Sequence, residues 1–483
     1  MVCKVLVQNL DPKMARAIRY FVYVIFAVTL SLFIFLMWIE RTHIPHPLQL
    51  QRKLARQALG YERRELSENG LDYPVFFGNF NSKEFEDNDL ENYLKKFSCS
   101  KLINGDTFEI QRGMNFLRMK NFTFPNRKDE KVAGDFQDCE KFKQRRGYIT
   151  GSQPQEEIDF PIAYSILFHE NLEQLERLLR VIYRPQNQYC IHVDRKSPDT
   201  LINAVRSLAG CFENVFVASK LEIVIYASYT RLLADINCMK DLVNNGKPWE
   251  YLLNMASSEL PLKTNSELVQ ILKVFNGSND IHEVLSLRIF DRFEKKHFTF
   301  INEGTRTGYM IHTEKKKEDP PFDLVITKGN AYNIFSRAFV EFALTDEIAI
   351  DLLGWSADTL TPDEHYWATL NNLYSNDFLD TPGGYKGDPD KKPYIARYIG
   401  WKTDKLKDRC KAQKYVHNIC VFSIADLPVL QGRMEVIANK FDITYDPLAY
   451  RCMEELIDNR TRSRAKITNI HKYKKLLFIG GKT

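Results

Sequence analysis

Several short motifs that mark common enzyme classes are missing from the 483-residue sequence. No GxGxxG pattern follows a predicted strand, which disfavours a dinucleotide-binding fold, and no GxxxxGK[ST] pattern occurs, which excludes a P-loop. A sulfotransferase needs a P-loop-like strand–loop–helix for its phosphosulfate donor, so that class is disfavoured as well. The cysteines form no CxxC pair, and a zinc site is therefore not expected.

An excess of charge of one sign is also lacking. The net charge is only +5 and no dense basic stripe occurs, so nucleic acid is not an expected partner. The composition, 44% hydrophobic and 27% charged, is that of a globular protein. The length allows one large domain or two.

One long stretch lacks charge altogether: residues 20–39 are twenty uncharged residues, which matches the thickness of a bilayer. Four basic residues precede this run against one acidic residue, so the positive-inside rule keeps residues 1–19 in the cytoplasm. The alternative is a cleaved signal peptide, but its apolar core would be shorter and followed by small residues, whereas MWIERTH stands here. The sequence predicts a cytoplasmic tail (1–19), a transmembrane signal anchor (20–39) and a large lumenal part.

The predicted lumenal part carries features of a secreted protein. Its eight cysteines are an even number, which suggests four disulfides in an oxidising compartment, although spacing alone does not give the pairing and buried free thiols are the alternative. Three Asn-x-Ser/Thr patterns, at Asn121, Asn276 and Asn459, are expected N-glycosylation acceptors. Residues 40–98 are predicted to form a stem and residues 99–159 an N-terminal lumenal segment, in which the highly charged stretch 126–147 is expected to be exposed.

From Phe160 onward, apolar runs alternate with amphipathic stretches. This alternation predicts an α/β fold with a mostly parallel sheet covered by helices on both faces. The last of the expected helices has Thr264 or Asn265 as its N-cap and Gly277 as its end. The expected strands are 160–169, 188–194, 214–219 and 249–256, and the expected helices are 171–183, 200–212, 226–245 and 264–277.

Ligands of such sheets bind beyond the carboxyl ends of the strands. His169 ends the first expected strand and Asp194 the second, so Asp194 can accept hydrogen bonds from a nucleoside; the alternative is a carboxylate that caps the following turn. The Asp-x-Asp pattern Asp388–Asp390 lies in a Gly/Pro-rich loop and is interpreted as a turn, so no metal site is expected there. A pyrophosphate would then need Lys or Arg for neutralisation.

The stretch TPDEHYWATL (361–370) places two consecutive carboxylates, Asp363 and Glu364, before an apolar run. They can cap a helix N-terminus, or one of them can serve as a general base.

Six long stretches together resemble the core 2/I-branching β-1,6-N-acetylglucosaminyltransferases, from about Cys99 to Cys452. They are FPIAYSILFHENLEQLERLLRVIYRPQNQYCIHVDRKS, NVFVASKLEIVIYASYTRLLADINCMKDL, ELPLKTNSELVQ, KGNAYNIFSRAFV, TPDEHYWATL and ANKFD. The resemblance implies a Golgi type II membrane enzyme with a GT-A catalytic domain (160–458) and a C-terminal tail (459–483). It further implies metal-free, inverting transfer of N-acetylglucosamine from UDP-GlcNAc to the 6-hydroxyl of a sugar in the O-glycan core Galβ1-3GalNAc, with no cofactor.

The resemblance implies a role for each of several residues. Glu364 matches the family's general base, and because UDP leaves as a charged phosphate, one carboxylate suffices. Asp363 is then expected to cap or orient the loop. Lys440 matches a lysine that stabilises the leaving UDP, but His417 stands where the family has arginine, with Lys414 as a nearby substitute. The other residues matched to UDP-sugar positions are Leu167, His169, Asp194 and Tyr226.

On the acceptor side, Arg292 matches a family arginine and Trp401 a stacking tryptophan; a core tryptophan is the alternative. The family's acceptor glutamate falls at His282 or Glu283, of which Glu283 is taken as the expected contact. Thr403 replaces a tyrosine, and the family's lysine falls near Arg288 or Ile289. The family pattern also implies the disulfides Cys99–Cys452, Cys139–Cys211, Cys190–Cys238 and Cys410–Cys420.

Two alternatives differ from this prediction in donor or class. His417 permits another donor such as UDP-glucose on the same fold, and the missing arginine also permits a non-catalytic lumenal glycan-binding protein. Peptide xylosyltransferases share the fold, but the stretch RPQNQYCIHVD is more similar to the core 2 enzymes. The expected partners are the membrane, UDP-GlcNAc and a glycoprotein O-glycan, and a homodimer is left open.

Overall fold

The computed structural model describes residues 87–118, 127–373, 380–403 and 410–479, which belong to one compact unit, Glu84–Thr483. The predicted anchor 20–39, most of the predicted stem and Asn121 lie outside the described residues. Within the described ranges, none of the helices combines the length and apolar composition that crossing a membrane requires.

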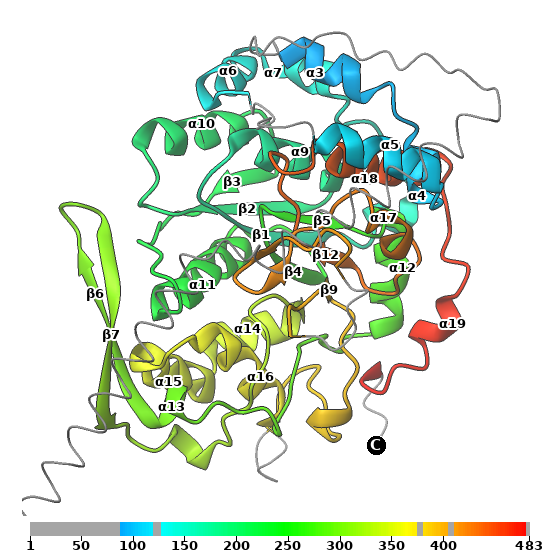
Figure 1. Cartoon of the computed structure of the whole chain (residues 1–483). Helices are drawn as coiled ribbons and strands as arrows, with labels where there is room; N and C mark the ends of the chain where they lie inside the picture. Colours follow the sequence, from blue (N-terminus) through cyan, green and yellow to red (C-terminus); the bar gives the residue numbers. More distant parts are fainter. Residues whose placement is uncertain (1–86, 119–126, 374–379, 404–409, 480–483) are drawn as a thin grey trace, which may run out of the picture. The chain divides into compact units, whose positions relative to one another are not determined.

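A five-stranded sheet in the order β3-β2-β1-β4-β8 forms the centre of the fold (Figure 1). β1, β2, β3 and β4 run parallel, and β8 pairs antiparallel with β4. The predicted parallel-rich sheet is therefore confirmed, with one antiparallel edge strand added. The bounds are β1 (Ile162–Phe168), β2 (Gln188–Val193), β3 (Val215–Val217), β4 (Tyr251–Ala256) and β8 (Ile334–Ser336).

Helices cover both faces of this sheet because side chains of each strand alternate between the faces. In β1, Ile162, Tyr164 and Ile166 join the core formed with α9, α10 and α12, whereas Ala163 joins the core formed with α11, α14 and α16. The bounds are α9 (Leu172–Ile182), α10 (Asp199–Ala209), α11 (Tyr229–Asn244), α12 (Asn265–Phe275), α14 (Arg337–Thr345) and α16 (Tyr366–Asn371).

The two ends of α12 are determined by residues that are close in the sequence. Thr264, rather than Asn265, is the N-cap, and with Glu267 it forms a capping box that satisfies two backbone N–H groups. The helix ends at Phe275, two residues before the predicted Gly277, and its C-cap is Asn276, whose φ of 48° is left-handed. Asn276 is exposed there, as is Asn459 within α18 (Pro447–Arg462), and glycosylation of both stays a prediction.

Short helices precede the sheet, and two disulfides fasten them. Cys99–Cys452 joins α4 to α18, and Cys139–Cys211 joins α7 to the residue that follows α10 by two positions. The stretch 126–147 is not exposed throughout, because Phe136 and Phe142 enter the core. These helices are α3 (Asp87–Leu94), α4 (Cys99–Ile103), α5 (Thr107–Leu117), α6 (Asp129–Gly134), η2 (Asp135–Gln137), α7 (Cys139–Arg146) and α8 (Gln155–Ile158).

The other two disulfides are Cys190–Cys238, between β2 and α11, and Cys410–Cys420. All four bridges join the pairs that the resemblance implies, and the alternative of buried free thiols is wrong for these residues.

Three smaller sheets lie outside the central one. β12 pairs with β5 and β9, β10 pairs with β11, and the long hairpin β6–β7 projects from the body in Figure 1. None of these sheets is part of the predicted alternation. Their bounds are β5 (Glu259–Pro261), β6 (Lys295–Asn302), β7 (Thr307–Lys316), β9 (Arg397–Ile399), β10 (Tyr415–Val416), β11 (Ile419–Cys420) and β12 (Ile437–Asn439).

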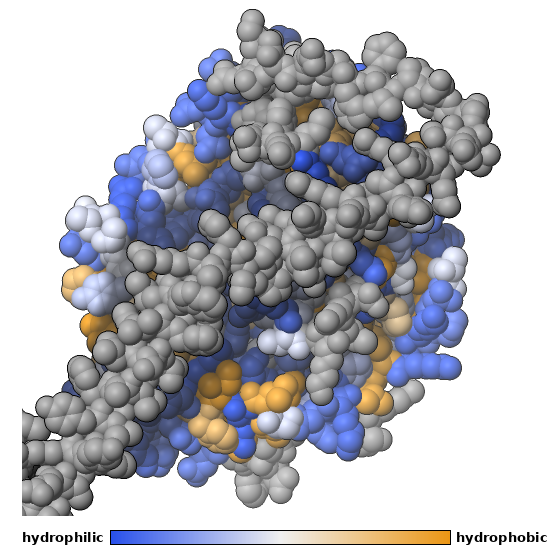
Figure 2. All heavy atoms as spheres, in the orientation of Figure 1, coloured by the Kyte–Doolittle hydropathy of each residue, from blue (hydrophilic) through white to orange (hydrophobic). Residues whose placement is uncertain are grey.

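Short helices connect these strands on the surface. In Figure 2, the visible described residues are largely hydrophilic, with small hydrophobic groups toward the lower edge. The remaining helices are α13 (Asp291–Glu294), η3 (Pro321–Asp323), α15 (Glu347–Trp355), η4 (Ser356–Asp358), η5 (Pro362–Glu364), η7 (Pro389–Lys391), α17 (Leu427–Leu430) and α19 (Ile470–Tyr473).

Candidate active site

The two consecutive carboxylates lie on η5, a single 3₁₀ turn held by backbone contacts from two sides. The Thr361 amide donates to the Ala227 carbonyl at 2.7 Å, and the Gly329 amide donates to the Glu364 carbonyl at 2.6 Å. Only glycine fits at position 329, because a Cβ there would lie 2.4 Å from the His282 carbonyl oxygen and 2.8 Å from Ala368 Cβ. The backbone of the turn is thus fixed independently of its side chains.

Neither carboxylate caps a helix. The N-cap of α16 is His365, and no side chain supplies a capping hydrogen bond there. Asp363 was expected to cap or to orient the loop, and the capping half is wrong, because its side chain is buried and faces Arg231, whose Nε lies 3.9 Å from Asp363 Oδ2. The orienting role stays a prediction.

Glu364 faces two cations at the surface. Arg292 Nη1 donates to Glu364 Oε2 at 2.6 Å, and Lys328 Nζ lies 3.8 Å from the same oxygen. Among the described residues, no hydrogen-bond donor contacts Glu364 Oε1, and a quarter of the side chain is exposed (26%). One carboxylate oxygen is thus held in place while the other is accessible, which suits a base that must receive a proton from an incoming hydroxyl.

On the predicted donor side, Asp194 holds the loop that carries Tyr226. Asp194 Oδ1 accepts from the Lys196 amide at 2.9 Å and from the Val224 amide at 3.2 Å. The turn-capping alternative therefore describes what Asp194 does in this structure, and its contact with a nucleoside stays a prediction.

Tyr226 and His417, both predicted to bind the donor, contact each other. Their rings stack with centroids 5.1 Å apart, and both residues are exposed. His417 and Asn418 form the two-residue turn between β10 and β11, with φ of 51° and 63°. Positive φ at both positions is characteristic of a type I′ hairpin turn, and histidine and asparagine tolerate it better than most residues.

Lys440 lies beside this hairpin, since its amide donates to the Cys420 carbonyl and its carbonyl accepts from the Phe422 amide. Its side chain is half-buried, and burial lowers the pKa of its ammonium group. The Glu259 carboxylate, which pairs with Arg397, opposes this lowering. Lys414, the expected substitute for the family arginine, instead lies 3.5 Å from Asp442 and over the Tyr445 ring.

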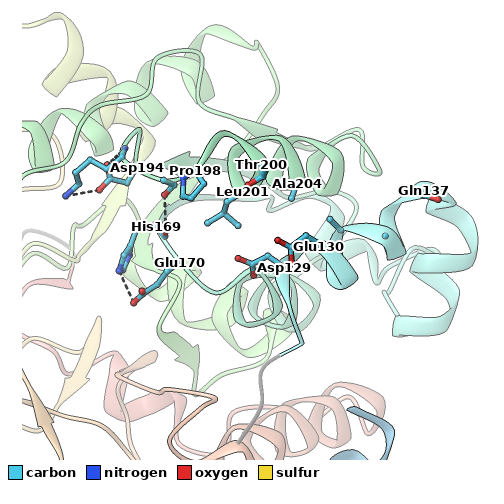
Figure 3. Close-up of a pocket in the computed structure, with 14 residues that line it drawn as sticks. Asp129, Glu130, Gln137, His169, Glu170, Asp194, Pro198, Thr200, Leu201 and Ala204 are labelled. Atoms are coloured by element: carbon cyan, nitrogen blue, oxygen red, sulfur yellow. Dashed lines mark hydrogen bonds and ion pairs between the residues drawn. The ribbon is translucent and has the colours of Figure 1, made fainter. Parts of the chain in front are cut away.

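A cavity of about 760 Å³ opens at the carboxyl ends of β1 and β2, where the sequence predicts a ligand (Figure 3). His169 and Asp194 lie at one end, and α6 and α10 supply the other walls. Four carboxylates line it, Asp129, Glu130, Glu170 and Asp194, so its electrostatics suit the uncharged base of a nucleotide better than its phosphates. Leu167, half-buried near the end of β1, is not among the lining residues.

The predicted acceptor residues separate in the structure. Arg292 donates a hydrogen bond to Glu364. The backbone of Trp401 forms an isolated antiparallel β-bridge with Ile419 in β11, close to the His417 turn. Glu283 was expected to contact the acceptor, which requires an accessible side chain, but it is only 2% exposed. Its carboxylate contacts Asn371 and Lys392 in the interior. His282 is half-buried, and Arg288 lies over the ring of the exposed Phe290.

One loop links the two halves of the site. The segment between β3 and α11 carries Tyr226, which contacts His417, and Ala227, which binds Thr361 three residues before Glu364. The contacts of this loop therefore connect the predicted donor contacts to the predicted base.

No cluster of three or more metal-ligating side chains occurs within the described ranges. The interpretation of Asp388–Asp390 as a turn is confirmed: it forms η7, and Asp390 accepts from the Leu285 and Ser286 amides.

Two residues of the site are absent from the sequence prediction. Lys328 belongs to the KGNAYNIFSRAFV stretch, but a lone lysine in a loop gives no signal of its contact with a glutamate 36 positions away. Arg231 looks in the sequence like a polar position of an amphipathic helix, although its side chain is only 13% exposed and lies beside Asp363.

Comparison with known proteins places this architecture in a family. The sequence profile of the Core-2/I-branching enzymes matches residues 162–431. A human beta-1,3-galactosyl-O-glycosyl-glycoprotein beta-1,6-N-acetylglucosaminyltransferase 3 is 38% identical over 384 residues, which are 77% of this chain and 86% of the relative. The human N-acetyllactosaminide beta-1,6-N-acetylglucosaminyl-transferase is 38% identical over 347 residues, 71% of this chain and 83% of the relative.

A third relative, the Bos taurus beta-1,3-galactosyl-O-glycosyl-glycoprotein beta-1,6-N-acetylglucosaminyltransferase, is 36% identical over 81% of this chain and 91% of its own length. The chain is therefore a glycosyltransferase by class. It belongs to the Core-2/I-branching enzyme family, and the resemblance noted in the sequence is confirmed.

Proposed function

We propose that this protein is a Golgi membrane enzyme with a GT-A fold that transfers N-acetylglucosamine from UDP-GlcNAc to the 6-hydroxyl of a sugar in an O-glycan core, with inversion and without a metal ion. The parallel-rich sheet and the family support the fold, and the names of the relatives support the transferred sugar and the linkage. The single observation that carries the proposal is Glu364, with one oxygen held by Arg292 and the other accessible.

The chemistry follows from that geometry. In an inverting transfer, the acceptor oxygen attacks the anomeric carbon as the bond to UDP breaks, and the acceptor proton must leave. Glu364 Oε1 takes this proton, while Arg292 keeps the carboxylate in position. Departing UDP carries negative charge, which the Lys440 ammonium group and a protonated His417 would offset.

A transfer assay on the full chain in detergent tests the proposal. UDP-GlcNAc and UDP-glucose are offered with either Galβ1-3GalNAc or N-acetyllactosamine as acceptor, because the relatives' names include both acceptor types. We expect transfer of N-acetylglucosamine to Galβ1-3GalNAc, with at least half of the activity retained in EDTA. Linkage analysis of the product by NMR identifies the substituted hydroxyl.

Other outcomes revise specific parts of the proposal. Preference for UDP-glucose would assign a different donor, and loss of transfer in EDTA with recovery on adding Mn²⁺ would assign a metal. A folded chain that transfers neither sugar but binds the glycan would support the non-catalytic alternative.

The His417 position gives a second prediction. Arginine carries a permanent charge and binds phosphate with two donors, whereas an imidazole ordinarily titrates near neutral pH. We expect His417→Arg to lower KM for UDP-GlcNAc by about 3- to 10-fold at pH 7.5, and less at pH 6.

His471→Arg, an exposed substitution in α19, is the matched control and should leave KM unchanged. Thermal unfolding is measured alongside, because position 417 has a left-handed backbone. An unchanged KM in a stable His417→Arg protein would argue against contact of residue 417 with the pyrophosphate.

A further inference from the structure

The two neighbouring carboxylates of η5 are directed to opposite sides of the turn. Glu364 meets Arg292 and Lys328 at the surface, whereas Asp363 is only 5% exposed and meets Arg231 of α11 inside the protein. A buried carboxylate is costly unless a cation accompanies it, so the position of Asp363 depends on Arg231.

Arg231 is itself fixed to the central sheet. Its Nη1 donates to Asp235 Oδ2 at 2.6 Å. Asp235, which is fully buried, also accepts from Ser165 Oγ in β1 and from Asn254 Nδ2 in β4. The guanidinium lies over the ring of Tyr332, 5.0 Å from its centroid. Arg231 is therefore held as rigidly as the strands beneath it.

The contact between Arg231 and Asp363 is electrostatic rather than a close hydrogen bond. The Nε–Oδ2 distance is 3.9 Å, and within the described residues neither Arg231 Nη2 nor Asp363 Oδ1 has a hydrogen-bond partner. Both atoms are buried. Burial raises the pKa of Asp363 to about 6, against the opposing attraction of Arg231. The charged groups that face Asp363 are Arg231 and Asp235 of α11 and Glu364 of its own turn.

We propose that Arg231 is a positioning residue for the base: by drawing Asp363 into the interior, it fixes the side-chain arrangement of η5 so that Glu364 alone faces Arg292 and the acceptor. Backbone contacts hold the turn and set the side on which each Cβ lies, and the cations on the two sides then hold each carboxylate in its orientation. This inference rests on the proposed role of Glu364.

Asp363→Asn in the full chain is the first test, because the change keeps the size of the side chain and Asp363 Oδ1 has no hydrogen-bond partner among the described residues, so the variant should fold. With UDP-GlcNAc and Galβ1-3GalNAc, we expect kcat to fall about 10-fold while KM for the donor stays within about 2-fold. The acid limb of the pH–rate profile should also move to lower pH. The reason is that Asp363 becomes protonated as pH falls through its pKa of about 6, which weakens its attraction to Arg231, and the substitution removes that titration.

Arg231→Met and the double variant complete the test. If the two residues act as one unit, the double variant should be no slower than Arg231→Met alone, whereas independent structural roles would multiply the two losses. Glu341→Gln, an exposed carboxylate of α14 paired with Arg337, is the control and should change neither kcat nor the pH profile.

The outcomes separate this inference from the proposed function. An active wild-type chain whose Asp363→Asn variant keeps its kcat and its acid limb would overturn the inference alone. A wild-type chain without transferase activity would overturn the proposed function and this inference together. If Arg231→Met does not fold, the kcat and pH profile of Asp363→Asn still decide.

Discussion

Replacing Glu364 with glutamine is expected to lower kcat by about 10²- to 10⁴-fold, the range that removal of a general base causes. The amide cannot accept the proton of the acceptor hydroxyl, yet its oxygen can still accept from Arg292, so the shape of the turn is preserved. KM for UDP-GlcNAc should stay within about 2-fold, since the predicted donor contacts are other residues. Steady-state kinetics on the full chain measure both constants.

The same Glu341→Gln variant serves as the matched control, because it makes an identical chemical change in an exposed ion pair. Thermal unfolding of both variants shows whether the fold is intact. A folded Glu364→Gln protein with more than a tenth of the wild-type kcat would exclude Glu364 as the base.

The second prediction is a large loss of stability when Glu454 is replaced with glutamine. Glu454 of α18 is buried and forms ion pairs with Arg177 and Arg180 of α9. These ion pairs join α18 to one of the helices that cover the central sheet. Glu454→Gln removes the carboxylate that Arg177 and Arg180 share and leaves them only Glu173 at 3.8 Å and Asp458 at 3.1 Å. Breaking such a network costs about 3–5 kcal/mol of unfolding free energy. Urea unfolding at pH 7, followed by tryptophan fluorescence, measures the loss.

The pH dependence of this effect has a definite sign. Burial alone would raise the pKa of Glu454, but Arg177 and Arg180 hold it at about 2, below its ordinary value of 4.5. A depressed carboxyl pKa stabilises the fold above the unfolded value, and that contribution is lost as pH falls from about 4.5 toward 2. The difference between variant and wild type should therefore be constant from pH 7 to pH 5 and shrink below that.

Glu455→Gln, at the neighbouring half-exposed partner of Arg451, is the control and should cost less than about 1 kcal/mol. Equal losses for Glu454→Gln and Glu455→Gln would contradict a special role for the buried network.

The sequence predicted those parts of the fold whose signals are local. The buried run 160–169 contains β1, Ile162–Phe168, because a parallel strand covered on both faces is apolar throughout. The prediction missed the β6–β7 hairpin, in which charged ends and exposed aromatic residues such as Phe298 and Tyr309 obscure the alternation. It also expected Glu283 at the acceptor surface, whereas Lys392, 109 positions later, pairs with it in the interior.

The sequence likewise predicted only part of the candidate site. The motif around Glu364 could be recognised from consecutive residues, but the partners that orient it come from distant segments. Arg292 and Lys328 approach from α13 and from the loop before β8, and Arg231 from α11. Consecutive residues do not reveal that Asp363 and Glu364 face opposite directions, because that depends on the backbone of the turn and on the groups that the tertiary fold places on each side of it.

The Cys99–Cys452 bridge has a consequence for how the chain is made. Its two cysteines are 353 residues apart. A ribosome that adds about 5–20 residues per second therefore incorporates Cys452 about 20 to 70 s after Cys99. During this interval Cys99 remains a reactive thiol while Cys139, Cys190 and Cys211 emerge, and wrong pairs can form before the correct partner exists. Production of the native protein should therefore depend on disulfide isomerisation late in synthesis. A chain that stops short of Cys452 would keep α4 detached from the helix that anchors it.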